Sequence, residues 1–285
     1  MGAHLLIVGG VIRNRPEKWR AEYTLSMVLL RDLVDADLGQ ERVELSESEM
    51  TRYALMIAGD SATGLDVLFE GGQPTCPSYA FVLAGWGLER MGQVAPVDHT
   101  RTMLAGVTLD LHRPLPDEGA VNMHGRISHV WDTGRAALIE VEVRCDFFTL
   151  RFVTYAPEAG GFGGDPPPPP LSRAELPMEL AVLLPTTESV LYRKIDPAGD
   201  AGVASARPVQ PGLVMMARAF VAMLLQLQAS PDRVRRVEGR FISPARSGEP
   251  LTLIARTDGN FLVRGDRGVV IDGGLMVLAT LPALP

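Results

Sequence analysis

The sequence is poor in cysteine and aromatic residues, and it contains no long apolar run. Two cysteines among 285 residues are too few for a disulfide framework and fit a reducing compartment, so we expect a cytoplasmic protein. No spacing of cysteine and histidine resembles a zinc site, and the sequence predicts neither a metal nor any other cofactor. No apolar stretch approaches the roughly 20 residues that a membrane-spanning helix needs.

Basic residues are also scarce relative to acidic ones. Lysine and arginine number 27 against 34 aspartates and glutamates, which gives a formal net charge of −7. Such a surface repels phosphate backbones and acidic lipid headgroups, so we expect neither nucleic acid nor membrane as a partner. Hydrophobic residues make up 46% of the chain, which is ample for packed cores.

One segment near the middle divides the chain. Glycines at 160, 161, 163 and 164 surround Phe162, and five prolines follow at 166–170. Glycines are expected to make the segment flexible, and the prolines to extend it. We therefore predict an N-terminal extension over residues 1–40, a first domain over 41–160, a linker over 161–175 and a second domain over 176–285.

The two halves repeat one order of elements. Serines and glutamates alternate over 46–49, a capping box that should begin a short helix in the first half. Each half then has a long apolar stretch that predicts a buried helix, over 78–91 and over 213–227. Strand-like runs follow each helix, over 107–112, 121–131, 136–144 and 147–155 in the first half, and over 234–242, 251–256, 261–264 and 269–281 in the second.

A helix that is apolar nearly all round must be covered on most of its sides. A curved antiparallel sheet wrapped around it provides that cover. The repeat therefore predicts an α+β protein with a tandem, or double, hot-dog fold. Two such sheets would pair edge to edge and hide two exposed edges.

Several short motifs occur in an order that is typical of one family. They include Leu111-His112-Arg113-Pro114, the glycine-rich junction, Leu191-Tyr192-Arg193 and Pro211-Gly212-Leu213. In these motifs the chain resembles, over roughly residues 41–285, the MaoC-like or hydratase 2 (R)-specific enoyl-CoA hydratases and dehydratases in their two-domain form. The resemblance implies an acyl-CoA, an acyl-carrier-protein-linked or a polyketide-type small molecule as the ligand. The carrier stays undecided.

The sequence departs from this family where catalysis takes place. In the family, Tyr-Arg precedes Gly-Asp-x-Asn-Pro-x-His, whose Asp and His hold a water molecule and move protons. Here Tyr192-Arg193 is followed by Lys194 and at once by Ile195-Asp196-Pro197, and no histidine occurs after His129. We therefore predict a degenerate active site, and the family's catalytic pair is carried onto no residue.

Four residues near this gap are candidates for altered chemistry. Asp196 and Asp200 are candidate general bases, or else solvated turn residues. Tyr192 is a candidate catalytic residue, and Arg193 could pair with a substrate carboxylate or phosphate, unless both only brace the loop. By resemblance, the Gly212 amide would polarise a thioester carbonyl, and the alternative is that Gly212 merely begins a closely packed helix.

Further candidates lie at or on the long helices. Met216 and Phe220 would line an acyl tunnel, or would serve ordinary core packing. Cys76, at the start of the first long helix, is a candidate nucleophile. His124 and His129 are an odd number of residues apart and should face opposite sides of a strand, so we expect hydrogen-bonded or surface histidines there rather than metal ligands.

These features favour an enzyme of altered chemistry over an inert binder. It would act on an acyl or polyketide thioester, or on its released product, by dehydration, isomerisation or cyclisation. A non-catalytic acyl-binding or partner subunit stays open as an alternative. A thioesterase is disfavoured, because residues 213–227 carry no acid. The oligomeric state is undecided, with a homodimer among the options.

Overall fold

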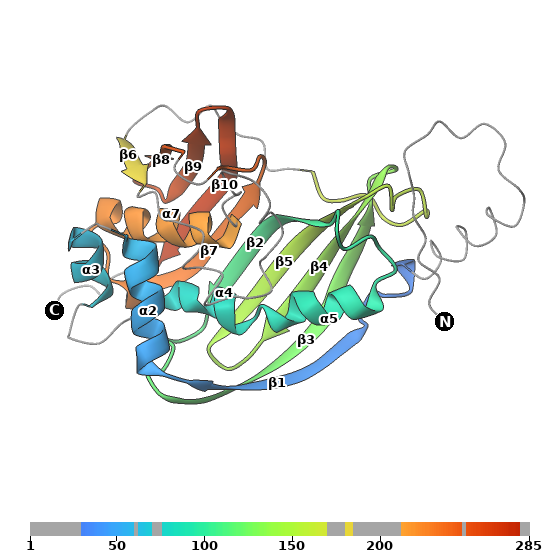
Figure 1. Cartoon of the computed structure of the whole chain (residues 1–285), viewed down its shortest axis with the longest axis horizontal. Helices are drawn as coiled ribbons and strands as arrows, with labels where there is room; N and C mark the ends of the chain where they lie inside the picture. The colour runs from blue at the N-terminus through green and yellow to red at the C-terminus, as the bar shows by residue number, and fades with distance from the viewer. Residues whose placement is uncertain are drawn as a thin grey trace, which may run out of the picture.

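The computed structural model describes residues 30–59, 62–69, 76–169, 180–184, 212–246 and 249–279. Ten of the described segments are strands of one sheet, in which every strand pairing is antiparallel. The strand order is β1-β3-β4-β5-β2-β7-β10-β9-β8-β6 (Figure 1). The helices lie on one side of this sheet.

The sheet contains the same pattern twice. The first half supplies β1 (Asp37–Leu45), β2 (Met103–Leu111), β3 (Gly119–Asp132), β4 (Ala136–Arg144) and β5 (Phe148–Pro157). The second half supplies β6 (Leu180–Leu184), β7 (Val234–Phe241), β8 (Leu251–Ala255), β9 (Asn260–Gly265) and β10 (Gly268–Leu278). Read from the two outer edges, the strand orders are β1-β3-β4-β5-β2 and β6-β8-β9-β10-β7. Each strand of the second half thus takes the place of the strand of the first half whose number is five lower. The halves therefore meet edge to edge at β2 and β7, as the tandem prediction requires.

The second half has the long apolar helix that the sequence predicts. It is α7 (Gly212–Leu227), in which residues 213–224 are all buried. One side of α7 packs on β6, β7, β8 and β10. The first half covers another side with α2 (Glu47–Ala58) and α3 (Ala62–Leu68) (Figure 1). This double cover explains why a helix that is apolar nearly all round is stable here.

The first central helix differs from the prediction of one continuous helix over 78–91. It consists of η1 (Pro77–Tyr79), α4 (Ala80–Leu83) and α5 (Trp86–Val94), with a break at Ala84 and Gly85. Gly87 allows α5 to approach β4 closely, because a Cβ there would lie 2.7 Å from Cγ2 of Val143. Helix α5 consequently packs against β1, β3 and β4.

The short helix α2 begins where the sequence predicts, but its cap differs. The Ser46 hydroxyl lies 2.8 Å from the Ser48 hydroxyl and makes no side-chain cap. The Ser46 carbonyl instead accepts hydrogen bonds from the backbone N–H groups of Glu49 and Met50, both at 3.0 Å. The sequence analysis also missed β1, α3 and β6, and β1 begins at Asp37, so it takes in the end of the segment set apart as an extension.

The glycine-rich junction is held in place, contrary to the expected flexibility. The Asp132 carboxylate accepts hydrogen bonds from the backbone N–H groups of Gly134 at 2.7 Å and of Gly161 and Gly163 at 2.8 Å. Gly161 and Gly163 have φ of 82° and 74°, a conformation that favours glycine. Partial burial acts to raise the pKa of Asp132, but the backbone N–H groups outweigh it and hold the pKa below its usual value.

The outer face of the sheet, away from the helices, carries an ion-pair ladder across the seam between the halves. Asp110 on β2 accepts from Nη1 of Arg151 at 2.8 Å and from Nη1 of Arg236 at 3.1 Å. Arg151 also pairs with the buried Glu142 at 3.0 Å. Arg236 belongs to β7, so Asp110 joins the first half to the second.

Candidate functional site

The candidate residues fall into two groups. Tyr192, Arg193, Asp196 and Asp200 lie outside the described residues, and their roles stay predictions. Gly212, Met216 and Phe220 all lie on α7, where the helix meets the sheet.

Gly212 is the first residue of α7 and lies against an aromatic ring. A Cβ at this position would be 2.9 Å from two ring carbons of Phe241, the last residue of β7. The packing therefore requires glycine here. The first N–H groups of any α-helix lack intrahelical acceptors, and the helix dipole makes this end electropositive. The end of α7 thus combines hydrogen-bond donors, an apolar ring and no side chain.

Met216 and Phe220 are fully buried one and two turns along α7. The methyl carbon of Met216 lies 2.4 Å from the place that a Cβ on Gly239 would occupy, beside Ile271. Met216 therefore packs directly on β7 and β10. In this arrangement the pair forms part of the core, and their predicted role in binding an acyl chain needs their side chains to move aside.

Sequence reasoning missed Arg218, the one charged residue within the apolar stretch of α7. Its side chain is only 2% exposed, and burial lowers its pKa to about 10. Arg218 is two residues from Met216, so it points to the helix side away from the sheet, where α2 and α3 pack. It stays protonated at neutral pH and places a positive charge between the two halves. The signal that could have found it is a lone arginine in an otherwise apolar helix.

No protein-family model matches the chain. The chain is 29% identical over 209 residues to the enoyl-CoA hydratase ChsH3 of Mycobacterium tuberculosis, an alignment that covers 64% of this chain and 72% of that protein. A MaoC-like dehydratase from Phytophthora capsici superposes with a TM-score of 0.76 at 16% identity, covering 88% of this chain and 98% of that one. The chain has the MaoC-like double hot-dog fold. The predicted resemblance to this group is confirmed.

A third similar structure supports the same fold. It is Rv0216 of Mycobacterium tuberculosis, which is described as having a double hot-dog fold. It superposes with a TM-score of 0.53 at 14% identity, and the superposition covers 88% of this chain and 98% of that one. At these identities the solved structures show the fold alone. They fit the two five-stranded halves described above.

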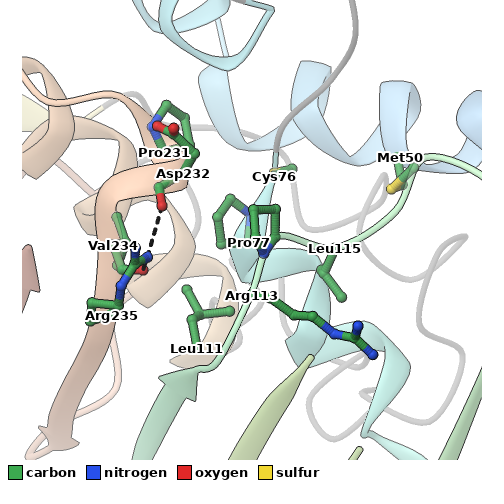
Figure 2. Close-up of a pocket in the computed structure, with 11 residues that line it drawn as sticks. Met50, Cys76, Pro77, Leu111, Arg113, Leu115, Pro231, Asp232, Val234 and Arg235 are labelled. Carbon is green, nitrogen blue, oxygen red and sulfur yellow. Dashed lines mark hydrogen bonds between the residues drawn. The ribbon is translucent and has the colours of Figure 1, made fainter. Parts of the chain in front are cut away.

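In the double hot-dog fold, the start of the first central helix is the counterpart of the Gly212 end of α7. A crevice lies there, lined from the first half by Cys76, Pro77 and Leu111, and from the second by Asp232 and Val234, among others (Figure 2). Its volume is about 10 Å³, room for a single water at most. Within the described residues, this crevice is too small for an acyl group.

The hypothesis that Cys76, in the same region, is a nucleophile is wrong. Burial raises the pKa of the Cys76 thiol to about 12, so it is not a thiolate at neutral pH. Its sulfur lies 3.7 Å from the Ser78 hydroxyl, and the Tyr53 hydroxyl donates to the Ser78 carbonyl at 2.9 Å. Cys76 belongs to a packed structural cluster.

His124 and His129 form hydrogen bonds, as predicted. The prediction that they face opposite sides of the strand is wrong, because the register of β3 shifts between Ile127 and His129 and brings both onto the face of Arg144 and Glu140. Nε2 of His124 lies 2.9 Å from Oδ1 of Asp37, and Nδ1 of His129 lies 3.0 Å from Oε1 of Glu140. Among the described residues, no cluster of three or more histidines, cysteines or acids could hold a metal. No helix in the described ranges is long and apolar enough to cross a membrane.

Proposed function

We propose that the chain binds an acyl or polyketide thioester, or a product released from one, at the N-terminal end of α7. The observation that carries the proposal is Gly212, a helix start without a side chain, packed on Phe241 and followed by an enclosed apolar helix. The similarity to an enzyme named enoyl-CoA hydratase supports the same ligand class. The carrier is either CoA or an acyl carrier protein.

The chemistry follows from the donors at this helix end. A thioester carbonyl oxygen would accept a hydrogen bond from the Gly212 N–H, where the helix dipole favours negative charge. Charge that develops on this oxygen when a proton leaves the α-carbon is stabilised by the same donor. Arg193 would bind the substrate, and Tyr192, Asp196 and Asp200 are the candidates for moving protons.

The reaction differs from ordinary hydration because the usual Asp and His pair is absent from the sequence. No histidine follows His129. His124 adjoins Gly125, which faces Trp86 on the helix side, so His124 points to the outer face, away from α7. Elimination of water from a plain 3-hydroxyacyl thioester is the reverse of hydration and would need the same missing groups. Isomerisation, cyclisation or loss of water from an already reactive substrate needs mainly positioning and an oxyanion donor, which the Gly212 N–H would supply.

The alternative is a non-catalytic acyl-binding or partner subunit. The shortened segment after Arg193 favours it, because the residues that hold the attacking water in the family have no counterpart there. A thioesterase is less well supported, since α7 has no acid and Glu89 of α5 is exposed.

Incubation with 2-enoyl and 3-hydroxyacyl thioesters of CoA and of acyl carrier protein tests this proposal. Calorimetry should detect binding, and mass spectrometry should detect a rearranged or cyclised product from a suitable substrate. Binding without conversion of any substrate would favour the partner subunit. Rapid hydration of an enoyl thioester, or its reverse, dehydration of a 3-hydroxyacyl thioester, would contradict the altered chemistry. A failure of every thioester to bind would contradict both functions.

A further inference from the structure

A second cavity, of about 310 Å³, lies at the outer edge of the first half. It is lined by residues of β1, α2 and the first central helix, and by none of α7. Its volume falls within the range of roughly 300–1,000 Å³ that small-molecule sites occupy. A ligand here would therefore be bound separately from the site proposed above.

The first central helix gives this cavity a mainly apolar side. Tyr79, Val82, Leu83 and Trp86 follow the spacing i, i+3, i+4, i+7 and share one face of the first central helix. Tyr79 and Leu83 are 4% exposed, whereas Val82 and Trp86 remain partly exposed. Val43 forms the facing wall, since its strand partner Val121 belongs to the core. The space between them suits a hydrocarbon or aromatic body.

The acidic groups of this cavity already have partners. Oε2 of Glu41 accepts from Nη2 of Arg90 at 2.5 Å. Glu49 lies near Tyr79, which stays protonated at neutral pH because burial, with help from Glu49, raises its pKa to about 12. These carboxylates therefore do not need a cationic ligand to balance their charge.

The cationic side chain that lines this cavity is Arg52, which has no ion-pair partner among the described residues. Arg52 donates through Nε to the Ser48 carbonyl at 3.1 Å and makes no other hydrogen bond within the described ranges. Arg52 is exposed, so its terminal N–H groups face solvent and are available to a ligand. The guanidinium fork of Arg52 matches a carboxylate in two hydrogen bonds.

We propose that this cavity binds a small apolar monocarboxylate, such as a medium-chain fatty acid. Its carboxylate pairs with Arg52, and its chain lies between Val43 and the helix face from Tyr79 to Trp86. Glu41 and Glu49 beside the single unpaired cation disfavour a dianion or a phosphate.

Calorimetric titration of the full chain with octanoate, 1-octanol and octylamine tests this proposal. Octanoate should bind with one-to-one stoichiometry and more tightly than the other two. Arg52→Gln should weaken octanoate at least tenfold, and Val82→Trp should fill the cavity and abolish binding. Arg42→Gln is the matched control, because Arg42 pairs with Glu44 at 2.8 Å on the other face of β1. This variant should bind octanoate as the wild type does.

Three results would overturn the proposal. They are tighter binding of octylamine or 1-octanol, no binding of octanoate to the wild-type chain, and octanoate binding that persists in both Arg52→Gln and Val82→Trp. The last result would place the acid elsewhere, for instance along α7. Circular dichroism checks that each variant is folded, and thioester binding measured on the same Arg52→Gln preparation separates this site from the function proposed for α7.

Discussion

The two central helices occupy equivalent places in a repeated fold, yet they are built differently. Helix α7 is continuous over 16 residues, and twelve of them in succession are buried. Its counterpart is divided into η1, α4 and α5, with a face that opens onto a cavity. The difference arises from what covers each helix, since α2 and α3 of the first half pack on α7.

This asymmetry shows that the two halves of a repeat can differ in structure at equivalent places. The half with the continuous helix has a glycine at the helix start, where we propose that a thioester carbonyl binds. The equivalent end of the first half is closed around Cys76 and Pro77, leaving about 10 Å³. The first half instead supports α7 through α2 and α3, and it keeps a separate cavity at its outer edge.

Truncation within each central helix should have the largest and most unequal effects. Phe220→Ala removes a fully buried ring from α7 and should lower the free energy of unfolding by about 3–5 kcal/mol. Val82→Ala, on the open face of the first central helix, should cost only about 1 kcal/mol, because Val82 is partly exposed. Urea denaturation of both variants measures the difference, and equal losses would show that the two helices are covered alike.

Adding a methyl group at the start of α7 should affect both stability and binding. Gly212→Ala brings a Cβ to 2.9 Å from the Phe241 ring and should cost about 1–3 kcal/mol as the ring shifts. The affinity of the Gly212→Ala variant for a thioester should fall as well. Gly92→Ala in α5 is the control, since a Cβ there meets His99 only at 3.7 Å. Unchanged thioester binding in a folded Gly212→Ala variant would argue against this end of α7 as the site.

The junction between the halves should depend on Asp132. Asp132→Ala removes the acceptor of three backbone N–H groups and should cost about 1–3 kcal/mol. The folded-state pKa of Asp132 is lowered, so its stabilising contribution is present above the unfolded-state pKa and is lost as pH falls through the folded-state value. Thermal melts of wild type and Asp132→Ala between neutral and strongly acidic pH should therefore converge in acid. A constant gap would contradict the assignment.

The smallest effect is expected at the seam. Asp110→Asn weakens ion pairs to Arg151 and Arg236 and should cost about 1 kcal/mol, because both arginines are partly solvated. The loss should shrink at high salt. Asp146→Asn, whose pair with Arg113 is exposed and lies within the first half, should change stability by a few tenths of a kcal/mol at most. Equal losses for the two variants would mean that the seam gains nothing from Asp110.

Sequence reasoning predicted the elements whose pattern is local. The helix over 213–227 follows from its unbroken apolar character, and the strand over 136–144 follows from its alternation; both agree with α7 and β4 within one residue. The elements that were missed have weak local patterns. Strand β1 reads as polar because it is an edge strand, and α3 has only seven residues.

The contacts that decide the sites are long-range, which no local pattern reveals. The Phe241 ring that requires glycine at 212 is 29 positions away in the chain. Asp132 holds glycines 29 and 31 residues later, so a segment that reads as flexible is fixed. The position of Cys76 at a helix start predicts a nucleophile, yet burial of the thiol raises its pKa and keeps it protonated.

Mass spectrometry in water enriched in ¹⁸O, with a 2-enoyl thioester as substrate, tests the central claim most directly. The account predicts that the thioester binds in a manner sensitive to Gly212→Ala and that no ¹⁸O enters the acyl chain at the β-carbon. Rapid incorporation of ¹⁸O at that carbon would show that ordinary hydration persists without the family's Asp and His, and would contradict the account.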